Sequence, residues 1–460
     1  MTRILSIGML LLFMPFPVTA QAQENKGSAE EQLAELKSQL EGLNESFIET
    51  KTSVDAMKKL KFSGYIQAQY QSTDSQGTSQ WKAGDFSGGT FPSNVKSRFA
   101  IRRGRLKAQY DNGLSQFVLQ VDVTQNGVGI KDAYVAIKEP WFKTATFTIG
   151  AFDRPFGYEI SYSSGQRESP ERSRMFQTLF PGEREIGAKI ELFPTEEMGI
   201  LSHFNLKAGM FNGVLNTANE NDNNKDLIGR FGFTLPFQEQ NLAIDGGISM
   251  YSGKITSNSA EVYHVSNKAF VRDSAASNIL ATFDRKYLGF DGQVYYDLPV
   301  LGGMQVRGEY ISGDQPGTAG SSAFYNPGTK QEVKALGDVK TVNNVQPVYN
   351  RNFSGMYVMY VQNVGLKNQA VVKYDVYDPN TDVKGTNIGV SGSKTGVADI
   401  KFNTLGLGWV YHWDENVKFT LYYDMVKNEK VNSAVTDKDL VRFKKDVKDN
   451  VFTFRVQYRF

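Results

Sequence analysis

From residue 62 to residue 460, apolar and polar side chains alternate along the chain with a period of two. In the first such segment, Ile66, Ala68 and Tyr70 alternate with Gln67 and Gln69. Successive side chains of a β-strand point to opposite faces, so this period predicts strands with one apolar face and one polar face. The chain is therefore expected to be mostly β.

Sixteen segments carry this alternation, at about 62–71, 97–110, 114–125, 128–139, 144–151, 185–193, 201–212, 226–236, 241–251, 285–297, 302–312, 353–362, 368–378, 402–412, 416–427 and 450–460. The connections between these segments alternate between short turns and long polar loops, with the two-residue connection Asn126-Gly127 as the exception. Short periplasmic turns and long external loops are typical of outer-membrane barrels. We expect an all-β fold over residues 61–460, a 16-stranded antiparallel transmembrane β-barrel with both ends in the periplasm.

The polar faces of these segments carry charged side chains, such as Arg103, Arg105 and Lys107 in the second segment. The core of a soluble β-sandwich could not bury such groups without pairing them. A membrane barrel turns the apolar face to lipid and the polar face to water. Aromatic residues near the segment ends match the girdles at the membrane interfaces: Tyr110, Trp141, Phe193, Trp409, Tyr411 and Trp413.

Residues 23–60 follow a different pattern, with apolar side chains at alternating steps of three and four and one polar lapse at Thr50. Such a heptad seam predicts a helix that packs against partner helices. We expect a periplasmic α-helical coiled coil with a seam of Leu33, Leu36, Leu40, Leu43, Phe47, Val54 and Met57. The alternative is a single amphipathic helix that lies on the barrel mouth.

Residues 1–22 are typical of a secretory signal peptide, with Arg3 followed by an apolar run over 4–16 and by small residues. Cleavage is expected after Ala20 or Ala22. The apolar run is too short to span a bilayer as a helix, and no later segment is long and apolar enough. The chain is expected to be exported and to enter the outer membrane of a Gram-negative bacterium as strands.

Composition narrows the possible partners. The formal net charge is +2, which gives no reason to expect nucleic acid, and the absence of cysteine excludes disulfides and thiolate metal sites. Residues 219–226 are rich in Asn and Asp but lack the glycine of a hand-type calcium loop, so a hydrated loop is the default. We expect neither a metal nor a cofactor.

The last segment ends in an aromatic residue. Phe452, Phe454, Val456, Tyr458 and Phe460 share one face of it. An amphipathic final strand with a terminal phenylalanine resembles the signal that the outer-membrane assembly machinery recognises. Phe454, Tyr458 and Phe460 are the expected contacts with that machinery, and the lipid of the outer membrane is the other expected partner of this face.

Four motifs lie on or next to the expected strands, namely FSGYIQAQY at 62–70, RFAIRRGR at 98–105, KDAYV at 131–135 and GAFDRPFG at 150–157. Together with the heptad segment that precedes them, they resemble the phosphate-selective porin O and P family, in its Bacteroidetes-type version. The resemblance implies a trimeric 16-stranded porin with one loop folded into the lumen. A trimer would make the coiled coil three-stranded.

A 16-stranded barrel is wide enough for an aqueous channel, so selectivity requires a narrower part. The best candidate is the long segment 152–184, which carries five arginines and five acidic residues rather than the arginine ladder of phosphate-selective members. Eleven cations against eight anions on the inward face give a mild positive field. The expected pore-lining and constriction residues are Arg103, Arg105, Lys107, Arg154, Arg167, Arg172, Arg174, Arg184 and Lys189. We expect passive diffusion of small hydrophilic solutes, with a mild anion preference.

Two rival functions come from other classes. An enzyme in a barrel, such as a phospholipase or protease, would need a catalytic histidine, but His203, His264 and His412 have no convincing serine and acidic partners by spacing. We therefore expect no enzymatic activity. An adhesin or receptor would use the long external loops, but no plug domain precedes the barrel, and a 22-stranded transporter would need a longer chain.

Overall fold

A computed structural model describes residues 29–460, apart from 76, 78–82, 216–219, 221, 328, 336–337 and 344. The chain forms two units that divide after Lys58. The expected signal peptide lies outside the described residues. In the described part of the chain, no helix is both long enough and apolar enough to cross a membrane.

The first unit contains one helix, α1 (Ala29–Lys58). It covers most of the range in which the heptad pattern predicted a helix. All seven seam residues are exposed, from 44% for Val54 to 73% for Met57. Exposed apolar residues in a stripe do not stabilise a lone helix, so the seam is available for partner helices.

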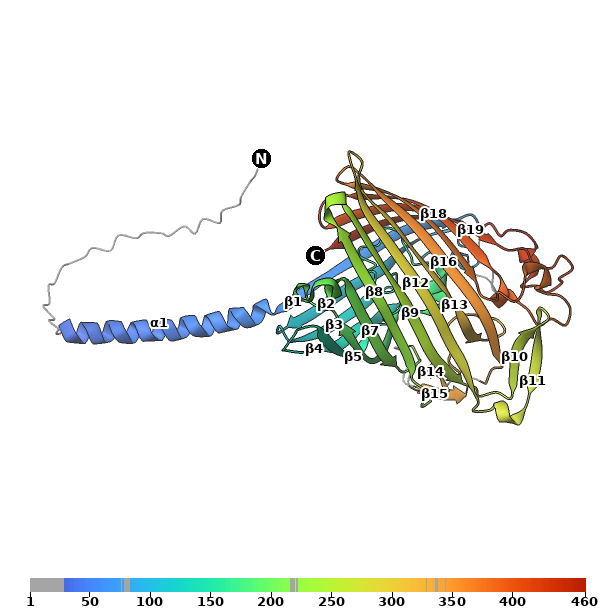
Figure 1. Ribbon diagram of the computed structural model, residues 1–460, viewed down its shortest axis with the longest axis horizontal. Helices are drawn as coiled ribbons and strands as arrows, with labels where there is room; N and C mark the ends of the chain where they lie inside the picture. The colour runs from blue at the N-terminus through green and yellow to red at the C-terminus, as the bar shows by residue number, and fades with distance from the viewer. Residues whose placement is uncertain are drawn as a thin grey trace. The chain divides into compact units, whose positions relative to one another are not determined.

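The second unit is a closed barrel of sixteen antiparallel strands (Figure 1). Strand β1 pairs with β2 on one side and with β20 on the other, which closes the sheet. The predicted fold class and strand number are confirmed. The barrel strands are β1 (Leu60–Thr73), β2 (Ser97–Asp111), β3 (Ser115–Thr124), β4 (Gly127–Lys138), β5 (Ala145–Asp153), β6 (Arg184–Leu192), β7 (Phe204–Phe211), β8 (Asp226–Phe237), β9 (Leu242–Thr256), β12 (Thr282–Leu298), β13 (Gly302–Gly317), β16 (Val348–Val364), β17 (Asn368–Asp378), β18 (Phe402–His412), β19 (Val417–Asn428) and β20 (Val451–Arg459).

Burial along the strands is the reverse of that in a soluble sheet. Gln67 and Arg103, which pair across β1 and β2, are 1% and 4% exposed, whereas the apolar neighbours Ile66 and Leu106 are 46% and 47% exposed. Polar side chains thus point into the barrel and apolar side chains point out. An outer surface of this kind is stable in lipid rather than in water.

The two ends of the barrel differ, as the lengths of the connections predicted. At one end, here the turn end, β strands are joined by short turns and the chain terminates at Phe460. At the other, the loop end, the connections are long, apart from the two-residue turn between β3 and β4. They contain two further hairpins, β10 (Glu261–Ser266) with β11 (Ala269–Ser274) and β14 (Thr329–Ala335) with β15 (Asp338–Asn343). Figure 1 shows β10 and β11 at the end of the barrel opposite to the C-terminus.

Three features differ from the sequence-based expectation. The segments that form the two loop hairpins were predicted only as long polar loops. Several strands extend further at the loop end; β16 begins at Val348 rather than near 353. The strand expected at 201–212 begins at Phe204, because Glu196–His203 forms 3-10 turns with a left-handed glycine, Gly199 (φ 59°). The other 3-10 turns are Gln238–Gln240, Ala276–Asn278, Gly385–Asn387, Val397–Asp399 and Val441–Lys444.

Part of the barrel interior is apolar, where the alternation predicted polar side chains. Phe176 and Phe180, on and just after the short helix α2 (Arg174–Leu179), pack with Phe156 against the inward Tyr251 of β9 and Tyr287 of β12. The inward positions of these strands toward the loop end carry aromatic side chains that the loop covers. The interior is therefore filled on one side.

Candidate pore constriction

Residues 154–183, here the inward loop, lie inside the barrel against its wall. Gln67 Nε2 on β1 donates a hydrogen bond to the carbonyl of Ser164 (2.9 Å), and Gln457 Nε2 on β20 donates to the carbonyl of Gly165 (2.9 Å). Wall side chains that point inward thus hold the backbone of the loop. This is the segment that the sequence identified as the candidate constriction.

Three glutamates of the inward loop form ion pairs with cations on different parts of the wall. Glu159 pairs with Lys373 on β17 (2.7 Å), and Glu168 pairs with Arg307 on β13. Glu171 binds three arginines at once, from β2 and β20: Arg102 (2.8 Å), Arg103 (2.7 Å) and Arg455 (2.8 Å). Apart from Arg102, the side chains in these pairs are only 3–6% exposed. We name Glu159, Glu168 and Glu171 the anchor glutamates.

The surrounding charges keep Glu171 ionised despite burial. Burial raises the pKa of this carboxyl, but the three guanidinium groups outweigh burial and hold its pKa well below the usual range. Burial likewise opposes ionisation of Glu159, and the ammonium of Lys373 lowers its pKa. Both carboxylates therefore stay charged at neutral pH, as an ion pair that fixes a loop requires.

A fourth carboxylate holds the loop from the wall. Glu309 on β13 accepts hydrogen bonds from the backbone N–H groups of Tyr158 (2.8 Å) and Glu159 (2.6 Å), and from the hydroxyl of Tyr357 (2.8 Å). A buried backbone N–H without a partner is costly, so this clamp satisfies two of them where the loop leaves the wall. Glu309 fixes the position of the segment that carries Glu159.

One arginine, Arg172, connects separate parts of the inward loop through hydrogen bonds and an ion pair. Arg172 donates to the backbone carbonyls of Glu159 (2.7 Å), Ile160 (2.9 Å) and Tyr162 (3.1 Å), and pairs with Glu183. All of these partners of the Arg172 guanidinium belong to the inward loop itself. These contacts connect the start of the loop to its end.

A second set of ion pairs is less completely buried than those of the anchor glutamates. They lie on β2–β7 and at the base of the inward loop, and their side chains are 7–28% exposed. We name this charged surface the wet wall. Its pairs are Arg105–Asp122, Lys131–Glu183, Arg184–Asp132, Lys189–Asp153, Lys189–Glu191 and Lys207–Glu191.

The predicted pore-lining residues fall into two groups. Arg105, Lys107, Arg184 and Lys189 belong to the wet wall. The other five belong to the inward loop or contact it: Arg103, Arg154, Arg167, Arg172 and Arg174. They are 0–9% exposed, and Arg105 and Lys189 of the wet wall are also only 8% exposed, so the two groups differ in their partners rather than in burial. The sequence did not distinguish the two groups, because both occupy the inward face or the inward loop.

Two of the buried arginines lie in unusual surroundings. Arg154 is fully buried beside Glu185 (3.5 Å) and over the ring of Phe180. Arg167 is 4% exposed, and within the described part of the chain none of its three guanidinium nitrogens has a hydrogen-bond partner. Burial lowers the pKa of Arg167. This guanidinium therefore destabilises the packed loop unless solvent reaches it.

Two further segments fold into the loop end of the barrel, where the sequence predicted only long polar external loops. In residues 83–91, the carbonyl of Phe86 accepts from Gln177 Nε2 of the inward loop (2.8 Å). In residues 318–327, the backbone N–H of Phe324 donates to the carbonyl of Thr178 (2.9 Å). The local signal in the first segment is its glycines, Gly84, Gly88 and Gly89, whose positive φ values permit tight bends.

Comparison with known proteins places the chain among outer-membrane channels. Residues 74–264 match the family model described as phosphate-selective porin O and P, which confirms the resemblance found in the sequence. No curated protein is detectably similar to the chain in sequence.

Solved structures with a similar fold are also outer-membrane proteins. OprB of Pseudomonas putida is 9% identical, with 89% of this chain and 96% of that chain covered and a TM-score of 0.53. The channel DcaP of Acinetobacter baumannii is 13% identical (87% and 97% covered, TM-score 0.48), and the trimer form of Vibrio cholerae OmpT is 10% identical (87% and 99% covered, TM-score 0.46). At such low identity, the similarity to OprB shows the barrel fold alone.

Proposed function

We propose that the chain passes small hydrophilic solutes by passive diffusion across the outer membrane, with a mild preference for anions. The match of residues 74–264 to the phosphate-selective porin O and P family supports this function. The observation that carries the proposal is the wet wall, a charged, solvent-touching surface inside a closed barrel. The turn end faces the periplasm and the loop end faces the outside. The inward loop narrows the lumen between them.

The proposed selectivity is mild because the wet wall has nearly equal numbers of cations and carboxylates. Its cations are Arg105, Lys107, Lys131, Arg184, Lys189 and Lys207, and its carboxylates are Asp122, Asp132, Asp153, Glu183 and Glu191. Six against five leaves one positive charge. Lys107 carries it, since among the described residues it has no ion-pair partner within 4.0 Å. A narrow channel with a small positive surplus enriches anions.

Replacing Lys107 with glutamine is expected to lower the ratio of anion to cation permeability, because it removes the surplus charge. The measurement is the reversal potential of the purified protein in planar bilayers under a salt gradient, with phosphate tested as a blocker. The matched control is Lys143→Gln, in an exposed turn at the turn end. Equal reversal potentials for K107Q and the unmodified protein would refute the assignment.

We also propose that the chain is a homotrimer held in part by α1. The exposed seam of α1 supports this, and the Vibrio cholerae OmpT structure named above is described as a trimer. The double change Leu36→Asn with Leu40→Asn is expected to reduce the yield of cross-linked trimer in the full-length protein. Lys37→Asn with Gln39→Asn alters the same turns off the seam and is expected to leave it unchanged. Equal yields would argue against a coiled coil.

Two further proposals concern the outward face and chemical activity. Tyr458 and Phe460 are 50% and 61% exposed at the end of β20, which supports their contact with lipid and with the assembly machinery together with Phe454. No hydrolase function is proposed. Lipase and protease assays on the purified protein are expected to be negative.

A further inference from the structure

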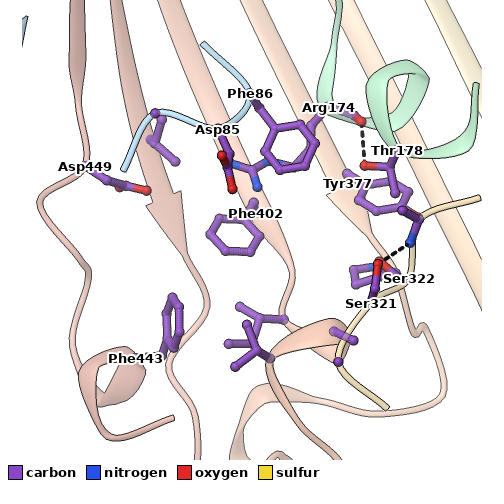
Figure 2. Close-up of a pocket in the computed structure, with 18 of the residues that line it drawn as sticks. Asp85, Phe86, Arg174, Thr178, Ser321, Ser322, Tyr377, Phe402, Phe443 and Asp449 are labelled. Carbon is purple, nitrogen blue, oxygen red and sulfur yellow. Dashed lines mark hydrogen bonds between the residues drawn. The ribbon is translucent and has the colours of Figure 1, made fainter. Parts of the chain in front are cut away.

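A pocket of about 270 Å³ opens at the loop end, where the two inward-folded segments meet helix α2. It lies between residues from distant parts of the chain, among them Asp85, Phe86, Arg174, Tyr377, Phe402 and Asp449 (Figure 2). We name it the mouth pocket. It is separate from the wet wall, and the proposed ion preference makes no use of it.

Arg174 is fixed inside the mouth pocket by two aromatic rings. Its guanidinium carbon lies 4.1 Å from the ring centre of Phe86 and 3.9 Å from that of Phe402. Stacking of this kind holds the plane of the guanidinium and shields both of its faces. Arg174 is therefore part of the pocket wall rather than a mobile cation.

Carboxylates outnumber this one guanidinium. Asp85 and Asp449 line the mouth pocket, and Asp375 and Asp424 lie directly beneath it, in a small cavity that Arg174 also borders. All four interact electrostatically with Arg174. Two other cations, Lys373 and Arg172, and a fifth carboxylate, Glu171, also border that cavity. The pocket and its floor thus have five carboxylates against three cations, a formal surplus of two negative charges.

Buried acceptors in this region lack donors. Asp449 is 7% exposed, and one of its carboxylate oxygens has no hydrogen-bond partner among the described residues; the same holds for one oxygen of Asp375. Buried polar atoms nearly always have partners, so an orphaned carboxylate oxygen at a cavity indicates a missing donor. An ammonium group offers three donors and no acceptor, and it carries the charge that the surplus requires.

The remaining surface of the pocket suits the body of such a ligand. The ring of Tyr377 lines it beside Phe402, and aromatic rings attract both ammonium groups and apolar carbon. Figure 2 shows Asp449, Phe402 and Tyr377 around the same space. A free anion such as phosphate matches neither the charge surplus nor the missing donors.

We propose that the mouth pocket binds primary amines with an apolar body, such as amino acids or short peptides with a free amino group, before they enter the channel. This proposal rests on the proposed porin function. It assigns to Asp449 the role of ammonium acceptor and to the aromatic rings the contact with the ligand's body. The mouth thereby concentrates cationic amines although the channel beneath it mildly prefers anions.

The test is block of single-channel current by tyramine added on the loop-end side, with 4-hydroxyphenylacetate as the anionic counterpart. Tyramine is expected to block and the anion is not. Asp449→Asn is expected to raise the half-blocking concentration about ten-fold, since one charge-assisted hydrogen bond is lost. Asp439→Asn, an exposed aspartate of the same loop, is the matched control and is expected to leave the block unchanged.

The pH dependence of tyramine block is a second test of the site. Burial raises the pKa of Asp449 to about 7, with smaller contributions from Asp446 and Asp74 and against the lowering effect of Arg174. Because a raised pKa leaves the carboxyl neutral below that value, tyramine block is expected to weaken as the pH falls through about 7. Asp449→Asn is expected to flatten this dependence.

Failure of the site and failure of the porin function give different results. A conducting protein that both compounds block equally, or whose block D449N leaves unchanged, overturns the mouth pocket as an amine site. A protein that does not conduct refutes the porin function instead. The site is then still testable by calorimetric titration of tyramine into the detergent-solubilised protein and into D449N, and equal heats would overturn it.

Discussion

Replacing all three anchor glutamates, Glu159, Glu168 and Glu171, with glutamine is expected to raise the single-channel conductance several-fold. Each substitution breaks a buried ion pair and leaves wall cations without a partner, at about 3–5 kcal/mol for each broken pair. The inward loop is then no longer fixed across the lumen. A 16-stranded barrel without a fixed internal loop has a wide aqueous channel.

The control for this variant carries the same three chemical changes outside the lumen, at the exposed residues Glu196, Glu197 and Glu239. It is expected to conduct like the unmodified protein. Deletion of residues 160–180 removes most of the loop and is expected to raise the conductance at least as much. If both the triple variant and the deletion conduct like the unmodified barrel, the loop is not the constriction.

The same anchors predict how conductance responds to acid. A carboxylate whose folded pKa is depressed stabilises the loop above its ordinary pKa and loses this effect only as the pH falls through the folded value. The pKa values of Glu159 and Glu171 are lowered. Conductance is therefore expected to stay level from about pH 8 to about pH 5. A stepwise rise within that range would contradict anchoring by these two residues.

Replacing Leu407 with arginine is expected to destabilise the barrel by about 2–4 kcal/mol, the cost of a cation at the middle of the lipid face. Leu407 lies in the middle of β18 and is 44% exposed on the outer surface. The measurement is the fraction of barrel that remains folded in a urea titration in lipid vesicles. Leu366→Arg introduces the same group in a fully exposed turn between β16 and β17 and is expected to have almost no effect.

The outcome distinguishes the two possible faces of the sheet. If L407R and L366R are equally stable, the outer surface of β18 does not face lipid, and the outer-membrane assignment of this barrel is wrong. If L407R alone unfolds at lower urea, the exposed apolar surface is the membrane surface.

The strands could be predicted because their signal is local. Ile66 and Gln67 differ in polarity and sit on opposite faces whatever the rest of the chain does, and sixteen repeats of that alternation predicted sixteen strands. The connections carried a second local signal, since short turns and long loops alternate. The hairpin β10–β11 was missed, because its pattern is short and lies within a polar loop.

The function of the charged residues could not be predicted in the same way. In the sequence, Glu159 and Glu171 counted only as negative charges that weaken a cationic ladder. In the structure they are anchors, and their partners Lys373 and Arg455 lie more than two hundred residues further along the chain. No local pattern encodes which cation a distant carboxylate meets.

The sequence by itself determined the class of the fold, the number of its strands and the direction in which each side chain points, because these follow from the two-residue period of an extended backbone. Only the tertiary structure decided which inward cations pair with carboxylates of the wall and which pair with the inward loop, and where distant loops meet to form the mouth pocket. The physical reason is that desolvation and ion pairing depend on which groups closure of the barrel brings within a few ångströms of one another.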